Sequence, residues 1–460
     1  MAQPSYQKKD ATQAIALTEK PLRAAVLTLA LPVMAEQALG TLTQIVDMAM
    51  VGRLGPESIA AIGVSMQPFG LVMALFAAIS VGNTALVARF IGAREHDNAS
   101  RTLAQSLLIA VVFAGLIAVG GYLFTEQIVS IMKPEPDVLA LAISYVRYMI
   151  PGFFFMLSGM MITGSLRGAG DTKTPMKVNM LVNLINPVLN YLLIYGKFGF
   201  PAMGVRGAAL ATTLARSTGG CIFLYLVLSG KRIIRIERDY IRAFDWPLIK
   251  RMLNIGVPAA IEQLITRSGQ MLYARTVSGL GTISYAAHQV AINAEAISYM
   301  PGFGFATAAT TLVGQNLGAK KPEQATRSGW EAWKLGSLLM GSMGVVLFLA
   351  PGLLMRIYTD DPEVIRQGIT CLRIAAFSQI PMGTSFIFSG ALRGAGDTRF
   401  MLFVSTASVW IVRLGLSLIL INQFDLALAG AWIAMALDWF FRGGIAALRF
   451  RSGRWQKVKV

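Results

Sequence analysis

The decapeptide LRGAGDTKTP at residues 166–175 returns almost unchanged as LRGAGDTRFM at residues 392–401. The numbering offset between the two copies is 226, close to half the length of a chain of 460 residues. Each copy is a polar interruption between two apolar runs. Its glycines permit a tight reversal, Asp171 or Thr174 can cap the next helix, and Pro175 is tolerated in the first helical turn. We therefore interpret each copy as a turn between two helices.

The same numbering offset matches many other positions. The matched pairs include Pro32 and Pro258, Glu36-Gln37 and Glu262-Gln263, Gln44 and Gln270, Gly92-Ala93 and Gly318-Ala319, Arg101 and Arg327, Pro136 and Pro362, Arg147 and Arg373, and Asp171 and Asp397. A single unchanged offset over about 140 residues is hard to obtain by chance and marks an internal repeat. The chain is therefore predicted to consist of two halves in tandem.

The composition indicates a membrane protein. Apolar residues make up 55% of the chain and charged residues only 14%, whereas soluble domains carry about 25% charged residues. The net charge of +17 could suggest nucleic-acid binding. However, the basic residues fall in short islands between apolar runs, as the positive-inside rule predicts, so no nucleic-acid partner is expected.

The apolar runs predict an all-α integral membrane fold of twelve transmembrane helices. The expected spans are 22–52, 58–88, 102–125, 136–165, 176–196, 204–229, 252–278, 284–313, 329–353, 363–391, 401–421 and 427–449. Because six spans per half is an even number, both six-helix lobes have the same orientation. They should therefore be related by a pseudo-two-fold axis along the membrane normal.

Seven basic regions alternate with basic-poor loops, which predicts a multi-pass protein of the cytoplasmic (inner) membrane with both termini in the cytoplasm. The expected domains are an N-terminal tail (1–21), an N-lobe (22–229), a basic linker (230–250), a C-lobe (251–449) and a basic tail (450–460). Residues 1–20 are polar and the first apolar run lacks a cleavage motif, so no cleavable signal peptide is expected.

Several other kinds of site are not indicated by the sequence. Cys221 and Cys371 lie in or beside apolar segments and predict packed thiols without a disulfide framework. His96 and His288 are far apart, so no metal cluster is expected. The sequence has no phosphate-binding loop and no clustered catalytic groups. We therefore expect neither an enzyme nor a cofactor.

Seven stretches resemble the multidrug and toxic compound extrusion (MATE) family of transporters. They are ALPVMAEQALGTLTQIVDMAMVGRLG (30–55), GAREHDNASR (92–101), SLRGAGDTKTP (165–175), MGVRGAALAT (203–212), AAHQVAINAEAISYMPGFG (286–304), LVGQNLGAKKPEQA (312–325) and ALRGAGDTR (391–399). They are most similar to the prokaryotic branch that includes the DNA-damage-inducible (DinF-type) proteins. The resemblance implies antiport, in which amphipathic and often cationic compounds leave the cell as protons or sodium ions enter.

The first span carries two acids inside an apolar run. On a helical wheel Glu36, Gly40, Gln44 and Asp47 lie at about 0°, 40°, 80° and 20°, which predicts one polar stripe. A carboxylate at membrane depth costs at least ~2.5 kcal/mol, so it tends to accept a proton or to recruit a cation. The resemblance implies an essential aspartate at Asp47. The alternative is that Asp47 simply faces water or Arg53.

The fifth span carries four asparagines on one face. Asn179, Asn183, Asn186 and Asn190 lie at about 0°, 40°, −20° and 20° on the wheel. Amides donate to a carboxylate and accept from a protonated one, so this stripe is suited to bind Asp47 in either form. The alternative is that these amides only join neighbouring helices.

The resemblance defines the proposed coupling site further. DinF-type members have Asn-x-x-x-Asp where this chain has Asn186 and Asn190. The missing second acid weakens the case for a two-carboxylate sodium site and gives more weight to Asp47. Thr212 matches a threonine that completes the family's polar cluster. The predicted coupling set is therefore Asp47, Asn186, Asn190 and Thr212, with H+ as the coupling ion, Na+ as the alternative, and no other metal.

The second half differs where the first half carries these polar groups. At the repeat offset, Tyr273 replaces Asp47, and Ser405, Val409, Val412 and Leu416 replace the four asparagines. The second half has its own acid, Glu295, which could bind a cationic substrate or a second ion, or could pair with Arg413. We also expect a set of substrate-binding or secondary polar residues: Glu36, Gln37, Gln44, Asn183, Glu262, Gln263, Tyr273 and Glu295. Glu36 and Glu262 could instead be scaffold.

The function expected from these features is secondary multidrug efflux by alternating access. The partners would be amphipathic or cationic drug-like compounds and membrane lipid, and we expect a monomer. The alternative is a flippase for lipid-linked oligosaccharides or phospholipids of the same superfamily. Arg216, Arg413 and Arg442 within the spans favour that alternative, whereas the acids and amides of the first and fifth spans favour antiport.

Overall fold

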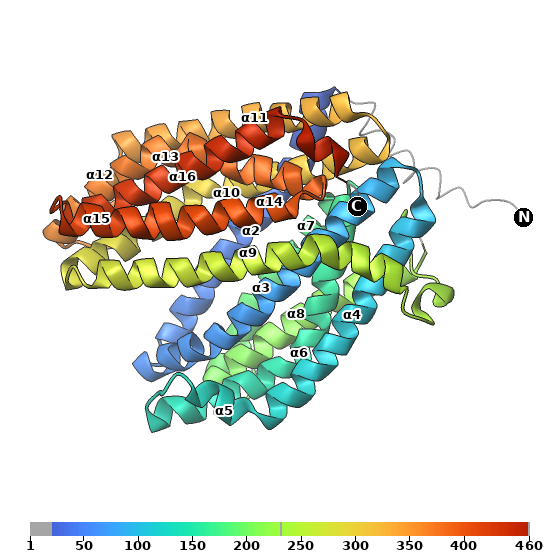
Figure 1. Cartoon of the computed structure of the whole chain (residues 1–460). Helices are drawn as coiled ribbons and strands as arrows, with labels where there is room; N and C mark the ends of the chain where they lie inside the picture. Colours follow the sequence, from blue (N-terminus) through green and yellow to red (C-terminus); the bar gives the residue numbers. More distant parts are fainter. Residues whose placement is uncertain (1–20, 231, 459–460) are drawn as a thin grey trace, which may run out of the picture. The chain divides into compact units, whose positions relative to one another are not determined.

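The computed structural model describes residues 21–230 and 232–458, and every regular element in them is helical (Figure 1). These residues divide into two compact units. The first unit contains Ala35–Leu253, and the second contains residues 21–34 with the chain from Asn254 onward. The predicted tail 1–21 lies almost wholly outside the described residues. The predicted limits of the lobes and of the linker stay predictions.

The first unit is built from six long helices and two short ones. They are the last part of α2 (Leu22–Gly52), then α3 (Pro56–Gly92), α4 (His96–Leu123), α5 (Thr125–Ser130), α6 (Pro136–Gly168), α7 (Lys173–Tyr195), α8 (Val205–Leu228) and the 3-10 helix η1 (Arg238–Ile241). Within the unit, α6 packs against α3 and α8. Its core includes buried Tyr145, Met149 and Val205.

The second unit repeats this order. After the first part of α2 come α9 (Trp246–Ser278), whose first turns up to Leu253 belong to the first unit, α10 (Thr282–Gly318), α11 (Pro322–Leu349), α12 (Pro351–Arg356), α13 (Pro362–Gly394), α14 (Thr398–Ala407), the π-helix η2 (Ser408–Gly415), α15 (Leu416–Asn422), α16 (Ala427–Arg451) and η3 (Arg454–Lys457). Here α13 packs against α10 and α16, as α6 packs against α3 and α8. The packing therefore follows the internal repeat of the sequence.

The predicted all-α fold with twelve long spans in two halves is confirmed. The helix ends differ from the predicted ones by up to seven residues, because polar first turns such as those at Pro322 and His96 extend a helix beyond its apolar stretch. The eleventh span is not one regular α-helix, since η2 interrupts it. No pattern in the sequence predicted that interruption.

The two copies of the repeated decapeptide are turns, as interpreted from the sequence. Gly170 and Gly396 have φ angles of 91° and 85°, which favour glycine. At the end of α6, a Cβ on Gly168 would lie 2.6 Å from the carbonyl oxygen of Thr84, and one on Gly394 would clash in the same way with Thr310. Each turn thus holds two helices in close contact.

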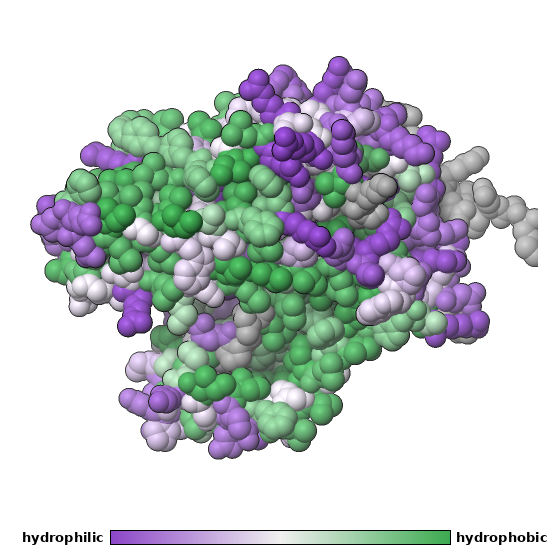
Figure 2. Space-filling view, viewed as in Figure 1, coloured by the Kyte–Doolittle hydropathy of each residue, from purple (hydrophilic) through white to green (hydrophobic). Residues whose placement is uncertain are grey.

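The helix surfaces are suited to lipid. Nine helices in the described residues contain a stretch long and apolar enough to cross a membrane. Figure 2 shows broad apolar areas along the helices, with hydrophilic side chains gathered toward their ends. Large apolar side chains are exposed, for example Leu116 and Leu338. Such continuous apolar exposure is typical of contact with a bilayer or a partner.

Candidate functional site

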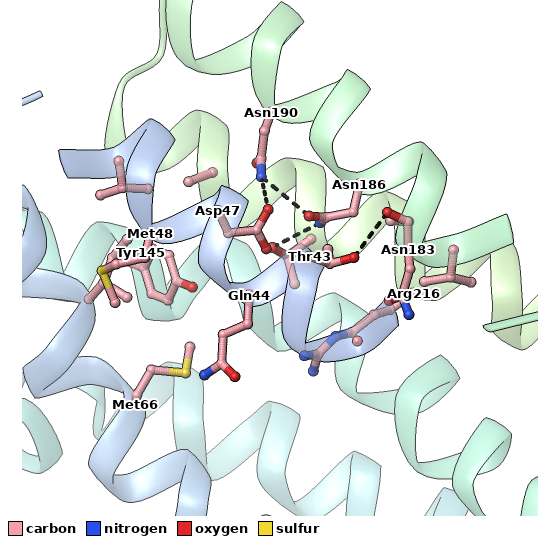
Figure 3. A pocket seen from close by; sticks show the side chains of 17 residues that line it. Thr43, Gln44, Asp47, Met48, Met66, Tyr145, Asn183, Asn186, Asn190 and Arg216 are labelled. Carbon is pink, nitrogen blue, oxygen red and sulfur yellow. Dashed lines mark hydrogen bonds between the residues drawn. The ribbon is translucent and has the colours of Figure 1, made fainter. Parts of the chain in front are cut away.

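A cavity of about 460 Å³ lies within the first unit (Figure 3). It is lined by side chains from α2, α3, α6, α7 and α8. The lining residues are Gly40, Thr43, Gln44, Asp47, Met48, Val51, Ile62, Met66, Tyr145, Val182, Asn183, Asn186, Asn190, Ala208, Thr212, Ala215 and Arg216. Its size falls in the range of pockets for small organic ligands.

Asp47 is the acid of this cavity. Asn190 Nδ2 on α7 donates to Asp47 Oδ1 on α2 over 2.7 Å. With its amide nitrogen turned toward the acid, Asn186 donates to both carboxylate oxygens, at 2.7 Å and 2.9 Å. Figure 3 shows the two asparagines and the aspartate pointing toward one another. Hydrogen bonds to a charged acceptor are the stronger kind, so this arrangement stabilises the ionised acid.

The two amides can serve the protonated acid as well. In the other orientation of the Asn186 amide, its oxygen faces Asp47 and accepts from Asn190 over 3.3 Å. That oxygen is then available to accept from a protonated carboxyl group. The other amide atom of Asn186 lies 3.4 Å from Thr212 Oγ1, and a hydroxyl can donate or accept. Turning one amide therefore matches the site to either protonation state.

Helix periodicity explains why these groups meet. Asn183, Asn186 and Asn190 are three or four residues apart, so α7 presents them on one face. Opposite them on α2, Thr43 Oγ1 donates to the Asn183 carbonyl oxygen over 3.3 Å. A Cβ on Gly40 would lie in ordinary van der Waals contact with Asn183 Nδ2, at 3.8 Å, so this part of α2 lies beside the Asn183 amide.

Glu36 and Asn179 are engaged with each other and do not line the cavity. Glu36 Oε1 accepts from Arg167 over 2.8 Å and from Asn179 over 2.7 Å. Glu262 makes the equivalent contacts in the second unit, from Arg393 over 3.1 Å and from Ser405 over 2.9 Å. All three positions are related by the repeat offset, so both acids are placed like scaffold groups.

The remaining secondary candidates divide between the two units. Gln44 and Asn183 line the cavity, whereas Gln37 does not. Gln263, Tyr273 and Glu295 belong to the second unit and are not part of this cavity.

The possible pairing of Glu295 with Arg413 is corrected by the structure. Arg413 forms its ion pair with Asp438 over 2.7 Å, and Glu295 Oε1 instead accepts from Gln379 over 3.3 Å. Asp438 is fully buried and lies on α16 at a spacing of four from Arg442, which it also binds. That spacing is present in the sequence, but Asp438 was not among the predicted residues.

Three polar lining residues of the cavity, Arg216, Tyr145 and Thr43, were in neither the predicted coupling set nor the predicted secondary set. Arg216 follows Thr212 by four residues on α8 and so shares its face, a signal present in the sequence. Thr43 lies four residues before Asp47 and so shares its face of α2, which is also a signal present in the sequence, whereas Tyr145 on α6 carries no pattern that would have marked it. Arg216 places one guanidinium in the same cavity as the single carboxylate of Asp47.

The described residues contain no group of three His, Cys, Asp or Glu side chains that could hold a metal ion. A sodium ion does not require such a group, because it can be bound by neutral oxygen ligands together with few carboxylates. The oxygens available to it are those of Asp47, Asn186, Asn190 and Thr212. Asn190 Oδ1 is buried without a hydrogen-bond partner in the described part of the chain. This cluster can therefore bind a proton and retains the donor set for Na+.

Comparison with known proteins gives consistent matches along the whole chain. A family model described as MatE matches residues 32–192 and 258–419, two segments whose starts are related by the repeat offset. A probable multidrug resistance protein NorM of Thermotoga maritima is 34% identical over 440 residues, which cover 95% of this chain and 94% of that protein. A protein of the same description from Bradyrhizobium diazoefficiens is 30% identical and covers 92% of each chain.

Solved structures agree with the fold. A MOP superfamily transporter from Pyrococcus furiosus matches with a TM-score of 0.88 at 24% identity, covering 98% of this chain and 99% of the other. An outward-facing multidrug resistance MATE family transporter matches with a TM-score of 0.87 at 23% identity, covering 97% and 99%. At these identities the likeness supports the fold alone.

Proposed function

Since this chain belongs to the MatE family of membrane transporters, we propose that it exports amphipathic, often cationic drug-like compounds in exchange for protons. It is a multi-pass membrane protein, and the export would proceed by alternating access. The observation that carries the proposal is Asp47, a single carboxylate in a cavity of about 460 Å³ with two amides in contact with it. The names of the curated relatives, multidrug resistance proteins, support the substrate class.

Proton binding at Asp47 would change the charge of the cavity. With Asp47 ionised, its negative charge offsets that of Arg216, and a cation can be held against the carboxylate. With Asp47 protonated, the cavity keeps only the positive charge of Arg216, which repels a bound cation. A proton from outside and a cationic drug from inside would thus compete for one site. This competition yields exchange without ATP.

The apolar part of the lining suits varied substrates. Met48, Met66, Val51 and Ile62 present aliphatic and thioether surface beside the polar groups. Methionine side chains are flexible and polarizable, so they adapt to ligands of different shape. A substrate with an apolar body and one positive charge fits both parts of the lining.

The coupling step would be a rearrangement of hydrogen bonds. Protonation converts an Asp47 carboxylate oxygen from acceptor to donor, which favours turning the Asn186 amide from N–H toward Asp47 to C=O toward Asp47. The turned amide also changes its contact with Thr212 on α8. Because α2, α7 and α8 all contribute to this network, its rearrangement is the proposed link to the movement of those helices.

Sodium is the second candidate for the coupling ion. One carboxylate and three neutral side-chain oxygens could ligate it, and Asn190 Oδ1 is buried without a partner in the described residues. The proton is preferred because the site has a single acid and donors already directed at it.

We further propose that the protein is located in the cytoplasmic membrane with both termini in the cytoplasm. We propose that it is a monomer and that it has neither an enzymatic activity nor a cofactor.

A flippase for lipid-linked oligosaccharides or phospholipids is the second candidate function. Arg216 in the cavity is the observation that favours it, since a guanidinium binds phosphate well. Against it, Arg413 and Arg442 already share the carboxylate of Asp438 and so offer less positive charge to a phosphate group.

Reconstituted vesicles can separate these possibilities. Vesicles are prepared with an inward gradient of either protons or sodium ions. The movement of a cationic dye against its own concentration gradient is then followed by fluorescence. Export driven by the pH gradient supports the proposal, and export driven only by sodium supports the second ion. Movement of a fluorescent lipid pyrophosphate without dye export would contradict both forms of antiport.

A further inference from the structure

The second unit carries a polar pair where the first unit carries an aromatic pair. Phe69 on α3 and Phe153 on α6 stack with ring centroids 4.8 Å apart and an interplanar angle of 22°. The positions related to them by the repeat offset are Glu295 on α10 and Gln379 on α13. Gln379 Nε2 donates to Glu295 Oε1 over 3.3 Å. The repeat has therefore exchanged an apolar contact between two helices for an acid and an amide.

This pair is isolated from solvent. Glu295 is 4% exposed and Gln379 is fully buried. Gln379 Oε1 is also buried and has no hydrogen-bond partner in the described residues. A buried acceptor without a hydrogen bond destabilises the folded protein. This acceptor belongs to the same Gln379 amide whose nitrogen already donates to Glu295. A protonated Glu295 would supply the missing donor.

The charges around Glu295 belong to one buried cluster. Asp438 on α16 forms ion pairs with both Arg413 on η2 and Arg442, each over 2.7 Å, and all three residues are at most 6% exposed. Two guanidiniums thus share one carboxylate. Glu295 interacts electrostatically with Arg413 and supplies the second negative charge. The cluster is neutral when Glu295 is ionised and has one excess positive charge when Glu295 is protonated.

The other titratable groups near the pair are Tyr273 on α9, His288 and Tyr299 on α10, and Cys371 on α13. Arg413 Cζ lies 5.8 Å from the ring centroid of Tyr273, whose ring is 5.7 Å from that of His288. The Tyr273 hydroxyl and His288 Nδ1 are buried without partners within the described chain. Neither of these two atoms therefore passes on the charge change through a hydrogen bond.

We propose that Glu295 is a second proton-binding site, separate from Asp47 and placed at a different position of the repeat. The proton adds to a carboxylate oxygen of Glu295, and the new O–H donates to Gln379 Oε1 once that amide turns. The arrangement parallels the first unit, where Asp47, Asn186 and Arg216 supply an acid, an amide and a guanidinium. Because this second site would act in the same antiport cycle, the inference rests on the proposed function.

The position of Arg413 links the protonation of Glu295 to a movement of the helix that carries Arg413. Arg413 lies in the π-helix η2, a geometry that occurs frequently at functional sites. The equivalent residue in the first unit is Pro187 in α7. A change in the charge facing Arg413 therefore acts on the irregular segment of its helix. Protonation of Glu295 leaves Arg413 less compensated and favours its displacement.

Infrared difference spectroscopy between acid and neutral pH tests the proposal without any substrate. A buried carboxylic acid gives a C=O stretch that disappears when the acid ionises. The wild-type chain is expected to show two such bands. Glu295→Gln removes one band and leaves the other, and Asp47→Asn does the reverse. If the Glu295→Gln variant shows the same two bands as the wild-type chain, the second site does not exist.

Two further variants keep the result interpretable. Glu363→Gln removes an exposed carboxylate at the start of α13 and should leave both buried bands in place. If Glu295→Gln does not fold, Glu295→Phe combined with Gln379→Phe rebuilds the stacked pair of the first unit and should also lack one band. Both bands persisting in that double variant would overturn the proposal. A failure of the proposed antiport gives a different result. The wild-type chain would then show no pH-driven dye export, although the infrared band of Glu295 would still be present.

Discussion

Arg167 donates to Glu36 over 2.8 Å, and the same pair occurs again in the second half as Arg393 and Glu262. Both glutamates also accept from the fifth span of their half, at Asn179 and Ser405. In each unit the arginine comes from the repeated decapeptide at the end of a long helix. The decapeptide is thus a turn whose arginine is anchored by an acid of the first helix of the half.

Glu36→Gln is expected to destabilise the protein by about 1.5–3 kcal/mol, because it removes a charged acceptor and leaves Arg167 without it. Glu262→Gln should have a similar effect through Arg393. Thermal unfolding in detergent measures both, with Glu363→Gln at an exposed ion pair as the control. Export per folded molecule should be retained in both variants. A stable Glu36→Gln variant that no longer binds dye would contradict the scaffold role.

Gly168→Ala is expected to cost about 1–3 kcal/mol, since the new Cβ would lie 2.6 Å from the Thr84 carbonyl oxygen. Gly394→Ala should cost at least as much, because its Cβ meets Thr310 in the same way. Gly444→Ala is the matched control in a helix, with no atom within 4 Å of its Cβ. Thermal unfolding should rank the control well above the other two. Equal stability of all three would show that the close helix contacts do not matter.

Arg216→Met tests how charge drives release. The proposal assigns Arg216 the positive charge that repels a cationic drug once Asp47 is protonated. Its removal should strengthen binding of a cationic dye at acidic pH by about tenfold, equivalent to ~1.4 kcal/mol, and slow the export of that dye. Dye binding measured at acidic and neutral pH gives the comparison. Weaker dye binding at acidic pH would contradict this role.

Asn190→Leu tests the donors at Asp47. The amide of Asn190 favours the ionised acid, so its loss makes the ionised form less stable. Binding of a cationic dye, which needs the ionised acid, should then begin about one pH unit higher, as expected for a lost interaction of ~1.4 kcal/mol. Dye titrations across pH measure the shift. No shift, or a shift to lower pH, would exclude Asn190 as a partner of the coupling acid.

Much of the fold could be read from the sequence because it depends on patterns that survive without tertiary context. Apolar runs gave the twelve spans, and LRGAGDT at two positions gave the repeat. Asp47, Asn186, Asn190 and Thr212 meet in one cavity because helix periodicity places them on inner faces. These signals are local in sequence or repeat at one offset.

Other features depend on contacts that no periodicity reveals. Whether Arg413 pairs with Glu295 or Asp438 depends on how η2 and α16 pack, and no periodicity predicts the π-helix that carries Arg413. Tyr145 enters the cavity only because α6 packs beside α8. The pair of Glu295 and Gln379 lies 84 residues apart on different helices and has no counterpart of the same chemistry in the first half.

The central claim is that Asp47 carries the proton that drives export. The most direct measurement compares wild-type and Asp47→Asn protein in vesicles with an imposed pH gradient, following uphill movement of a cationic dye. Asparagine keeps the size of the side chain but cannot bind and release a proton. The account predicts that Asp47→Asn folds and inserts normally but shows no uphill export. Retained pH-driven uphill export by Asp47→Asn would contradict it.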